Sequence, residues 1–204
     1  MQLILQEYRT FDYTPAMIQE SRSMNGGRIV LSGILQKADA LNQNGRIYPR
    51  NILEREIRNY QKFVVENRAL GELDHPETSV VELKNVSHII REATMNDDGT
   101  VHGRVELLNT PSGKILQSLV ESGVKLGISS RGVGSTQKEG DHQVVQEDFQ
   151  LICWDFVSEP STPGAFMLKE SREIKESEII ELKKFYSKSD RLYRVANDIL
   201  FNVG

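Results

Sequence analysis

A tight-turn sequence near the middle of the chain constrains the fold more than any other feature. The sequence NDDG at residues 96–99 separates two strand-like runs, residues 80–95 and 100–109. Asp-Gly is favoured in hairpin loops because such loops require positive backbone φ angles. The two runs are therefore predicted to pair as antiparallel strands of a hairpin.

Helices and further strands are predicted on either side of this hairpin. Residues 51–68 carry apolar side chains at helical spacing, with Asn51 as the expected N-cap. A second helix is expected to start at Thr110-Pro111 and to end at Gly123. Strands are predicted in the apolar, β-branched segments 28–37 and 144–158. This order fits neither a regular βαβ array nor a sandwich, and it predicts a compact α+β domain with a mostly antiparallel sheet.

The division of the chain follows from where these patterns begin and end. A length of 204 residues with 38% hydrophobic residues is enough for one good core. Residues 1–27 end in SRSMNGGR and are expected to form a loosely docked arm. Residues 28–167 are expected to form the folded domain, and the charged segment 168–204 a helical or flexible tail.

Charge and cysteine content exclude several classes of function. The net charge is −4 and both signs are spread along the chain, so no basic stripe for nucleic acid is expected. The single cysteine, Cys153, rules out an internal disulfide or a cysteine-based zinc site and is expected to be buried. No apolar run has the length of a membrane span, and the start of the chain lacks the pattern of a secretory signal. We therefore expect a soluble intracellular protein with no membrane partner.

The stretch LGISSRGVGS at residues 126–135 has the residues for nucleophilic chemistry. Ser129 and Ser130 end a short apolar run, and Arg131, Gly132 and Gly134 follow. The glycines predict a tight turn with an exposed serine, and backbone N–H groups from Ser130 to Gly132 are candidates for binding an oxyanion. The alternative is an ordinary polar turn between strands.

A serine nucleophile needs a base and a group that orients it. Among the four histidines, His75 in GELDHP is the candidate base, since it lies between a predicted helix and a proline. Asp155 lies among apolar residues in LICWDFVS, and a buried carboxylate needs a partner. Asp155 is therefore the candidate that orients His75. A structural ion pair with Arg131 or Arg104 is the alternative.

Taken in order, several motifs resemble the prohead core protein proteases of large tailed phages. These motifs are GRIYPR, GELDHP, VHGRVEL, GISSRGVGS and WDFVSEPSTP, and they span about residues 28–166. The resemblance implies an α+β fold like that of the herpesvirus assemblins, a mostly antiparallel sheet or barrel flanked by helices. It also implies His75 as general base and Ser129 as nucleophile, with Ser130 as the alternative, and Asp155 as the third member.

The same resemblance implies a biological setting. Its members are serine endopeptidases that cut scaffold and capsid precursor proteins inside the procapsid, in the host cytoplasm, after glutamate in a (Leu/Ile)-x-Glu pattern. No cofactor or metal is implied, and a homo-oligomer is left open. The triplet Leu5-Gln6-Glu7 and three tail triplets ending at Glu170, Glu176 and Glu181 match the pattern, which suggests self-cleavage.

Two other functions compete with the protease. In the first, Glu72, Asp74 and His75 bind a metal with His88 or His102, although their spacing matches no recognised ligand pattern. In the second, the chain is a non-catalytic scaffold or capsid-assembly module with the same fold.

Overall fold

The computed structural model describes residues 3–10, 14–76 and 78–158. Its helices and strands confirm the α+β class, with mostly antiparallel sheets flanked by helices. In chain order, the elements are β1 (Leu3–Thr10), α1 (Pro15–Met24), β2 (Val30–Lys37), β3 (Arg46–Ile47), α2 (Arg50–Val65), β4 (Leu70–Glu72), the 3-10 helix η1 (Leu83–Asn85), β5 (Val86–Met95), β6 (Thr100–Leu107), α3 (Pro111–Glu121), β7 (Gly127–Gly134), β8 (Thr136–Glu139), β9 (His142–Val145) and β10 (Gln150–Val157).

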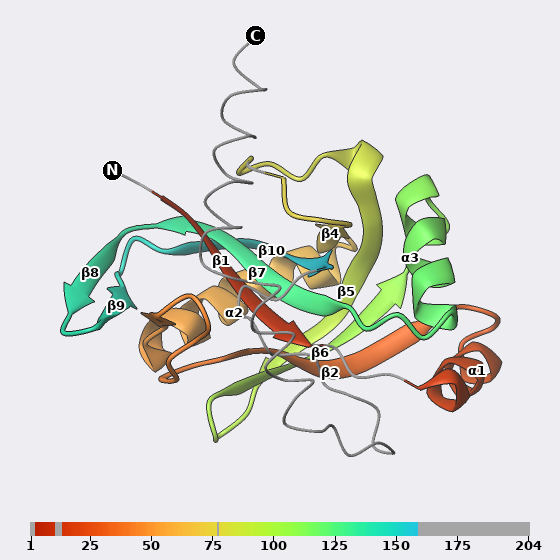
Figure 1. Ribbon diagram of the computed structural model, residues 1–204, viewed down its shortest axis with the longest axis horizontal. Helices are drawn as coiled ribbons and strands as arrows, with labels where there is room; N and C mark the ends of the chain where they lie inside the picture. Colours follow the sequence, from red (N-terminus) through yellow and green to blue (C-terminus); the bar gives the residue numbers. More distant parts are fainter. Residues whose placement is uncertain (1–2, 11–13, 77, 159–204) are drawn as a thin grey trace, which may run out of the picture. The chain divides into compact units, whose positions relative to one another are not determined.

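Three sheets organise this part of the chain (Figure 1). One has the strand order β2-β6-β5-β4, the second β1-β7-β10, and the small third sheet β3-β9-β8. An isolated parallel bridge between Leu73 and Phe156 links the end of β4 to β10. Within the described residues these sheets do not close into a barrel. The strand β10 therefore lies where the two larger sheets meet.

The predicted hairpin is present as β5 and β6, which pair antiparallel from Met95↔Val101 to His88↔Leu107. Gly99 has a φ of 79°, the left-handed conformation that the turn requires. The first of the two strands is shorter than predicted, since residues 80–82 lie outside any strand and η1 precedes Val86. Glu82 is held instead by a hydrogen bond from its N–H to the side chain of Glu72, so its backbone does not join the sheet.

Both predicted helices form, and both pack against β5. The start of α3 is as expected: the Thr110 side chain accepts a hydrogen bond from the N–H of Gly113 at 3.0 Å, and Gly123 beyond the helix has a φ of 75°. The prediction of Asn51 as N-cap of α2 is wrong, because Pro49 holds that position. The Asn51 side chain donates a hydrogen bond to Glu147 instead.

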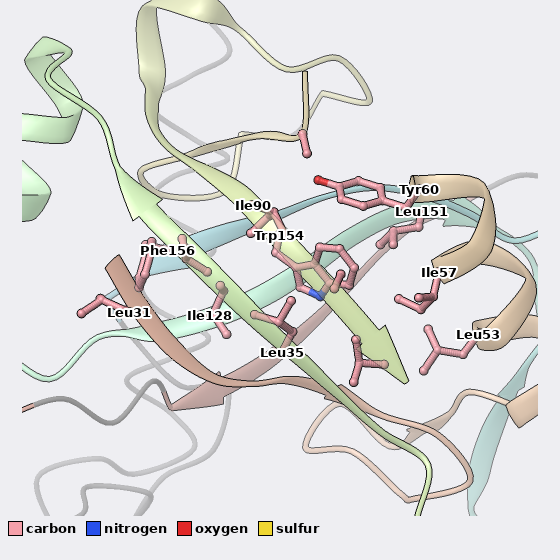
Figure 2. Close-up of a cluster of buried hydrophobic side chains, with 14 of the residues drawn as sticks. Leu31, Leu35, Leu53, Ile57, Tyr60, Ile90, Ile128, Leu151, Trp154 and Phe156 are labelled. Carbon is pink, nitrogen blue, oxygen red and sulfur yellow. The ribbon is translucent and has the colours of Figure 1, made fainter. Parts of the chain in front are cut away.

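A single core joins β2, α2, β5, β7 and β10. Figure 2 shows Trp154 at its centre, with Tyr60 and Ile90 nearby. The Tyr60 and Trp154 rings meet edge to face, with their centroids 4.9 Å apart. Aromatic pairs of this geometry add to the stability gained from area burial. Since Trp154 precedes Asp155 in an alternating strand, its burial turns Asp155 to the opposite face of the sheet.

The N-terminal region differs from the expected loosely docked arm. Residues 3–10 form β1, which pairs antiparallel with β7 along its whole length, and Pro15–Met24 form α1. Thr14 caps this helix through a hydrogen bond from the N–H of Met17, and Pro15 occupies its first turn. The SRSMNGGR sequence marks the end of a helix rather than the end of an arm. Among the described residues, no helix is both long and apolar enough to cross a membrane.

Candidate active site

Asp155 is the centre of a buried polar cluster between β10, β7 and the end of β4. Its Oδ2 atom accepts hydrogen bonds from His75 Nδ1 at 2.8 Å and from Arg131 Nε at 2.9 Å. Its Oδ1 atom accepts from the N–H of Glu72 at 2.9 Å, from Arg131 Nη2 at 3.2 Å and from Cys153 Sγ at 3.3 Å. The carboxylate has no exposed surface and is fully supplied with donors.

These contacts keep Asp155 ionised. Burial by itself would raise the pKa of this carboxyl, but the hydrogen bond from His75, the charge of Arg131 and the N–H of Glu72 together hold the pKa below its ordinary value. An ionised carboxylate only accepts hydrogen bonds, so Nδ1 of His75 must carry the proton. In the neutral imidazole this leaves the lone pair on Nε2.

The second ring nitrogen of His75, Nε2, is buried and has no hydrogen-bond partner among the described residues. The side chain as a whole keeps 16% of its surface exposed, whereas Asp155 keeps none. A base with one nitrogen fixed by a carboxylate and the other unoccupied is the arrangement that serine hydrolases require.

The two serines of β7 face opposite sides of the sheet. Ser129 is paired with Asp155 in the β7–β10 ladder, and Ser130 is paired with Trp154. Directly opposite residues in an antiparallel pair point to the same face, so Ser129 faces the side of Asp155 and Ser130 the side of the Trp154 core. Both are almost fully buried, and the described residues contain no hydrogen bond from either serine to His75.

The expectation of a tight turn at SSRG is wrong, because Gly127–Gly134 form the central strand of a sheet. Its glycines have a different use: a Cβ on Gly132 would lie 2.4 Å from the Phe149 ring, and one on Gly134 would lie 2.8 Å from the Phe149 backbone. The glycines are needed because Phe149 crosses directly over the strand. The two glycines are thus required by Phe149, which lies outside the motif, so the motif alone does not reveal why they are present.

The predicted oxyanion role of this backbone is also wrong. Residues Ser130 to Gly132 are paired with β1 on one side and with β10 on the other. In a central strand the ladders use the N–H groups, so these donors are not available to a substrate. Arg131 is not available to contact an oxyanion or a substrate glutamate either, since all three of its side-chain nitrogens donate to other groups and the side chain is fully buried.

Asp155 has both of the partners considered for it, His75 and Arg131, but not Arg104. Arg131 pairs with Asp155 and His75 does so too, so the structural ion pair and the His–Asp contact exist together. Arg104 is half-exposed on β6 and lies 3.9 Å from Glu92. It takes no part in the cluster.

The residues proposed for a metal site do not come together. Glu72 is paired with Arg131, His102 is exposed on β6, and His88 Nε2 lies 2.9 Å from the carbonyl oxygen of Trp154. Burial lowers the pKa of His88 to about 4 despite the nearby Asp155 charge and this carbonyl. Among the described residues, no group of three or more His, Cys, Asp or Glu side chains is arranged to hold a metal ion.

Sequence reasoning missed two parts of the cluster. Glu72 was considered only as a metal ligand, and Thr78 was not considered, yet Arg131 contacts the Glu72 carboxylate and donates to the Thr78 carbonyl at 2.8 Å. The one signal for Glu72 was its position three residues before His75, in the turn predicted between a helix and a strand. Cys153 is buried as expected, and burial raises the pKa of its thiol well above the ordinary value.

Comparison with known proteins identifies the family of the chain. Residues 11–179 match the family described as prohead core protein serine protease. The chain is 33% identical over 158 residues to the prohead core protein protease of Enterobacteria phage T4, which covers 75% of this chain and 73% of the relative. The structure of the bacteriophage T4 capsid assembly protease is similar, with a TM-score of 0.66 and 25% sequence identity over 78% of this chain and 99% of that one. The chain therefore belongs to the family of prohead core protein serine proteases, and it is a capsid maturation protease.

Proposed function

We propose that this protease is a serine endopeptidase in which Ser129 is the nucleophile, His75 the general base and Asp155 the group that orients His75. Ser129 Oγ attacks the carbonyl carbon of the scissile peptide while its proton passes to Nε2 of His75. The same proton then goes to the leaving amine, which gives an acyl-enzyme. A water molecule, deprotonated by His75, hydrolyses the acyl-enzyme and restores the serine.

The observation that carries this assignment is the 2.8 Å contact from His75 Nδ1 to Asp155 Oδ2, together with a His75 Nε2 that has no partner among the described residues. Ser129 is favoured over Ser130 because its register with Asp155 directs its side chain to the face where His75 lies. Ser130 faces the apolar side, next to Trp154, where a peptide would have to displace the core.

The substrates are inferred from the relatives. A prohead core protein protease and a capsid assembly protease are named for work on an assembling capsid. We infer that this chain cuts scaffold and capsid precursor proteins in the interior of the procapsid, within the host cytoplasm. Cleavage after glutamate in a (Leu/Ile)-x-Glu pattern is part of the proposal and rests on the resemblance alone.

Self-cleavage is the final part of the proposal. The triplet Leu5-Gln6-Glu7 is in the extended strand β1, where Glu7 is paired with Ser130 and Tyr8 with Ser129. The triplets ending at Glu170, Glu176 and Glu181 lie outside the described residues. Further triplets match the pattern within folded elements, among them 70–72 in β4, where Glu72 is fully buried, and 119–121 at the end of α3, where cleavage would require local unfolding.

A fluorophosphonate probe tests the serine mechanism directly. The wild-type protein should be labelled and Ser129→Ala should not, and this variant should lose at least about 1,000-fold in kcat on a peptide containing a (Leu/Ile)-x-Glu site. Ser130→Ala is the matched control and should keep its labelling. His75→Ala should lose labelling as well, because the serine then has no base.

Each other outcome has a definite meaning. Labelling that survives in Ser129→Ala and disappears in Ser130→Ala moves the nucleophile to Ser130. Activity in both variants removes the serine mechanism. A wild-type protein that is neither labelled nor active on any scaffold or capsid precursor favours the non-catalytic assembly module.

A further inference from the structure

We infer that Arg131 and Glu72 are positioning residues, which hold the segment that carries His75 (residues 73–76 and 78–82) against the strand that carries Ser129. The inference rests on the proposed function of His75 as the base. It assigns a role to two fully buried charged side chains that the proposed chemistry does not use.

Arg131 connects three separate parts of the chain. It extends from the central strand β7, and its Nε and Nη2 atoms donate to Asp155 on β10. Nη2 also donates to the Glu72 carboxylate at the end of β4. Nη1 donates to the backbone carbonyl of Thr78 at 2.8 Å, three residues beyond His75. One guanidinium therefore orients the carboxylate that binds His75 and also fixes the backbone just after His75.

Glu72 extends this attachment to the far end of the segment. Its Oε2 atom accepts from Arg131, and its Oε1 atom accepts from the N–H of Glu82 at 3.0 Å. The N–H of Glu72 itself donates to Asp155. Arg131 and Glu72 thus contact the segment at Thr78 and at Glu82, on the C-terminal side of His75.

The segment has little else to hold it. Residues 73–76 and 78–82 belong to no helix or strand, apart from the isolated bridge at Leu73. Val80 keeps 68% of its surface exposed, so it is not anchored by burial in the core. Backbone contacts from Leu73 to Asn85 and from Asp74 to Phe156 fix its N-terminal side. Beyond His75 the polar contacts of Arg131 and Glu72 supply the attachment, and segments with few apolar contacts open readily when such contacts are lost.

The chemistry of the pair fits positioning better than stabilisation. Arg131 and Glu72 both have no exposed surface, and the desolvation of a buried ion pair cancels much of its attraction. What such a pair supplies is fixed geometry, because a guanidinium presents several donors in one rigid plane. A lysine keeps the charge but cannot contact Asp155, Glu72 and the Thr78 carbonyl at once.

Arg131→Lys tests the inference. We expect kcat to fall at least about tenfold while KM stays within about threefold, with an equal fall in the rate of fluorophosphonate labelling. Hydrogen exchange at the amides of 78–82 should become faster at a temperature where the fold is intact. Arg91→Lys is the matched control, since Arg91 on β5 also pairs with a glutamate, Glu106, and should keep wild-type kcat and exchange.

Glu72→Gln provides the second variant if Arg131→Lys does not fold. The amide oxygen can still accept from Glu82, but the charged contact to Arg131 is lost, so kcat should fall at least about threefold with faster exchange at 78–82. The inference is overturned if a folded Arg131→Lys, or failing that a folded Glu72→Gln, has the kcat and exchange of the wild type. This result differs from a failure of the proposed function, in which the fluorophosphonate probe would not label even the wild-type protein.

Discussion

At the scale of single residues, His88 is a buried histidine that the chemistry does not require. Its Nε2 atom lies 2.9 Å from the carbonyl oxygen of Trp154, its Nδ1 atom lies 2.9 Å from the Ser87 hydroxyl, and its ring meets that of Phe156 edge to face. Asp155 is the charged group that acts on it. The cost of burial exceeds this attraction, so the folded protein keeps His88 neutral, with a pKa of about 4.

This burial predicts a loss of stability in mild acid. The pKa of a histidine in the unfolded chain is about 6.5, whereas the pKa of His88 in the folded protein is about 4. Between these two pH values the unfolded state binds a proton that the folded state does not bind at His88. The free energy of unfolding should therefore decrease by about 2 kcal/mol from pH 7 to pH 5 through this residue alone. The lowered pKa of Asp155 adds nothing in this window, because its contribution is lost only below the ordinary aspartate value, about 3.9.

Denaturant unfolding at both pH values measures the effect. His88→Gln should reduce the pH-dependent decrease by about 2 kcal/mol, whatever its effect on stability at pH 7. His102→Gln, an exposed histidine on β6, should leave the decrease unchanged. An equal decrease in the wild type and in His88→Gln would show that His88 is not the titrating group.

At the scale of elements, the site depends on how closely β4 approaches β10. A Cβ on Gly71 would lie 2.2 Å from His88 Nε2 and 2.2 Å from the Trp154 carbonyl oxygen. Gly71 therefore lets His88 reach across β4 to β10, and the next residue, Glu72, donates to Asp155. The position of β4 sets the start of the segment that carries His75.

Gly71→Ala should consequently be costly. The added methyl group meets backbone on one side and a fully buried ring on the other, so we expect the free energy of unfolding to fall by roughly 3 kcal/mol. Gly140→Ala is the control: its φ of 60° disfavours alanine, but nothing lies within 4 Å, so a loss of about 1 kcal/mol is expected. Equal losses in the two variants would contradict the close approach of β4 to β10.

At the scale of the whole molecule, the strand nearest the N-terminus and the strand of the serines lie side by side (Figure 1). β1 is an edge strand and is already extended, which is the conformation that a protease requires of its substrate. Its Leu5-Gln6-Glu7 triplet differs in conformation from the match at 119–121, which is in the helix α3. The match at 70–72 is also in an edge strand, β4, but its Glu72 is fully buried.

Prolonged incubation followed by intact-mass spectrometry tests self-cleavage at this triplet. The wild type should yield a species that begins at Tyr8, and Ser129→Ala should remain intact. Glu7→Gln is the control and should block this product while leaving cleavage of a separate substrate unchanged. If the wild type keeps its first seven residues while it cleaves that substrate, the N-terminal self-cleavage is refuted and the protease assignment is unaffected.

The sequence alone determined the features that depend on neighbouring residues. The hairpin at Gly99 and the Thr110 cap follow from local turn and capping chemistry, and the structure contains both. The apolar run around Asp155 also required a buried carboxylate with a partner, as found. The segment around Asp155 is also one of the motifs that carry the resemblance to the family.

Only the tertiary structure decided what depends on residues far apart in the chain. Gly132 and Gly134 suggest a turn in the sequence, but they are glycines because Phe149 crosses the strand at these positions and leaves no room for a Cβ. No neighbouring segment of the sequence indicates a pairing strand for residues 3–10, and in the structure they pair with the distant strand β7. The contacts of Arg131 to Asp155, Glu72 and Thr78 join segments 24, 59 and 53 residues apart, which no local pattern encodes. Pairing across such distances depends on which strands become neighbours, and that is set by the packing of the whole core.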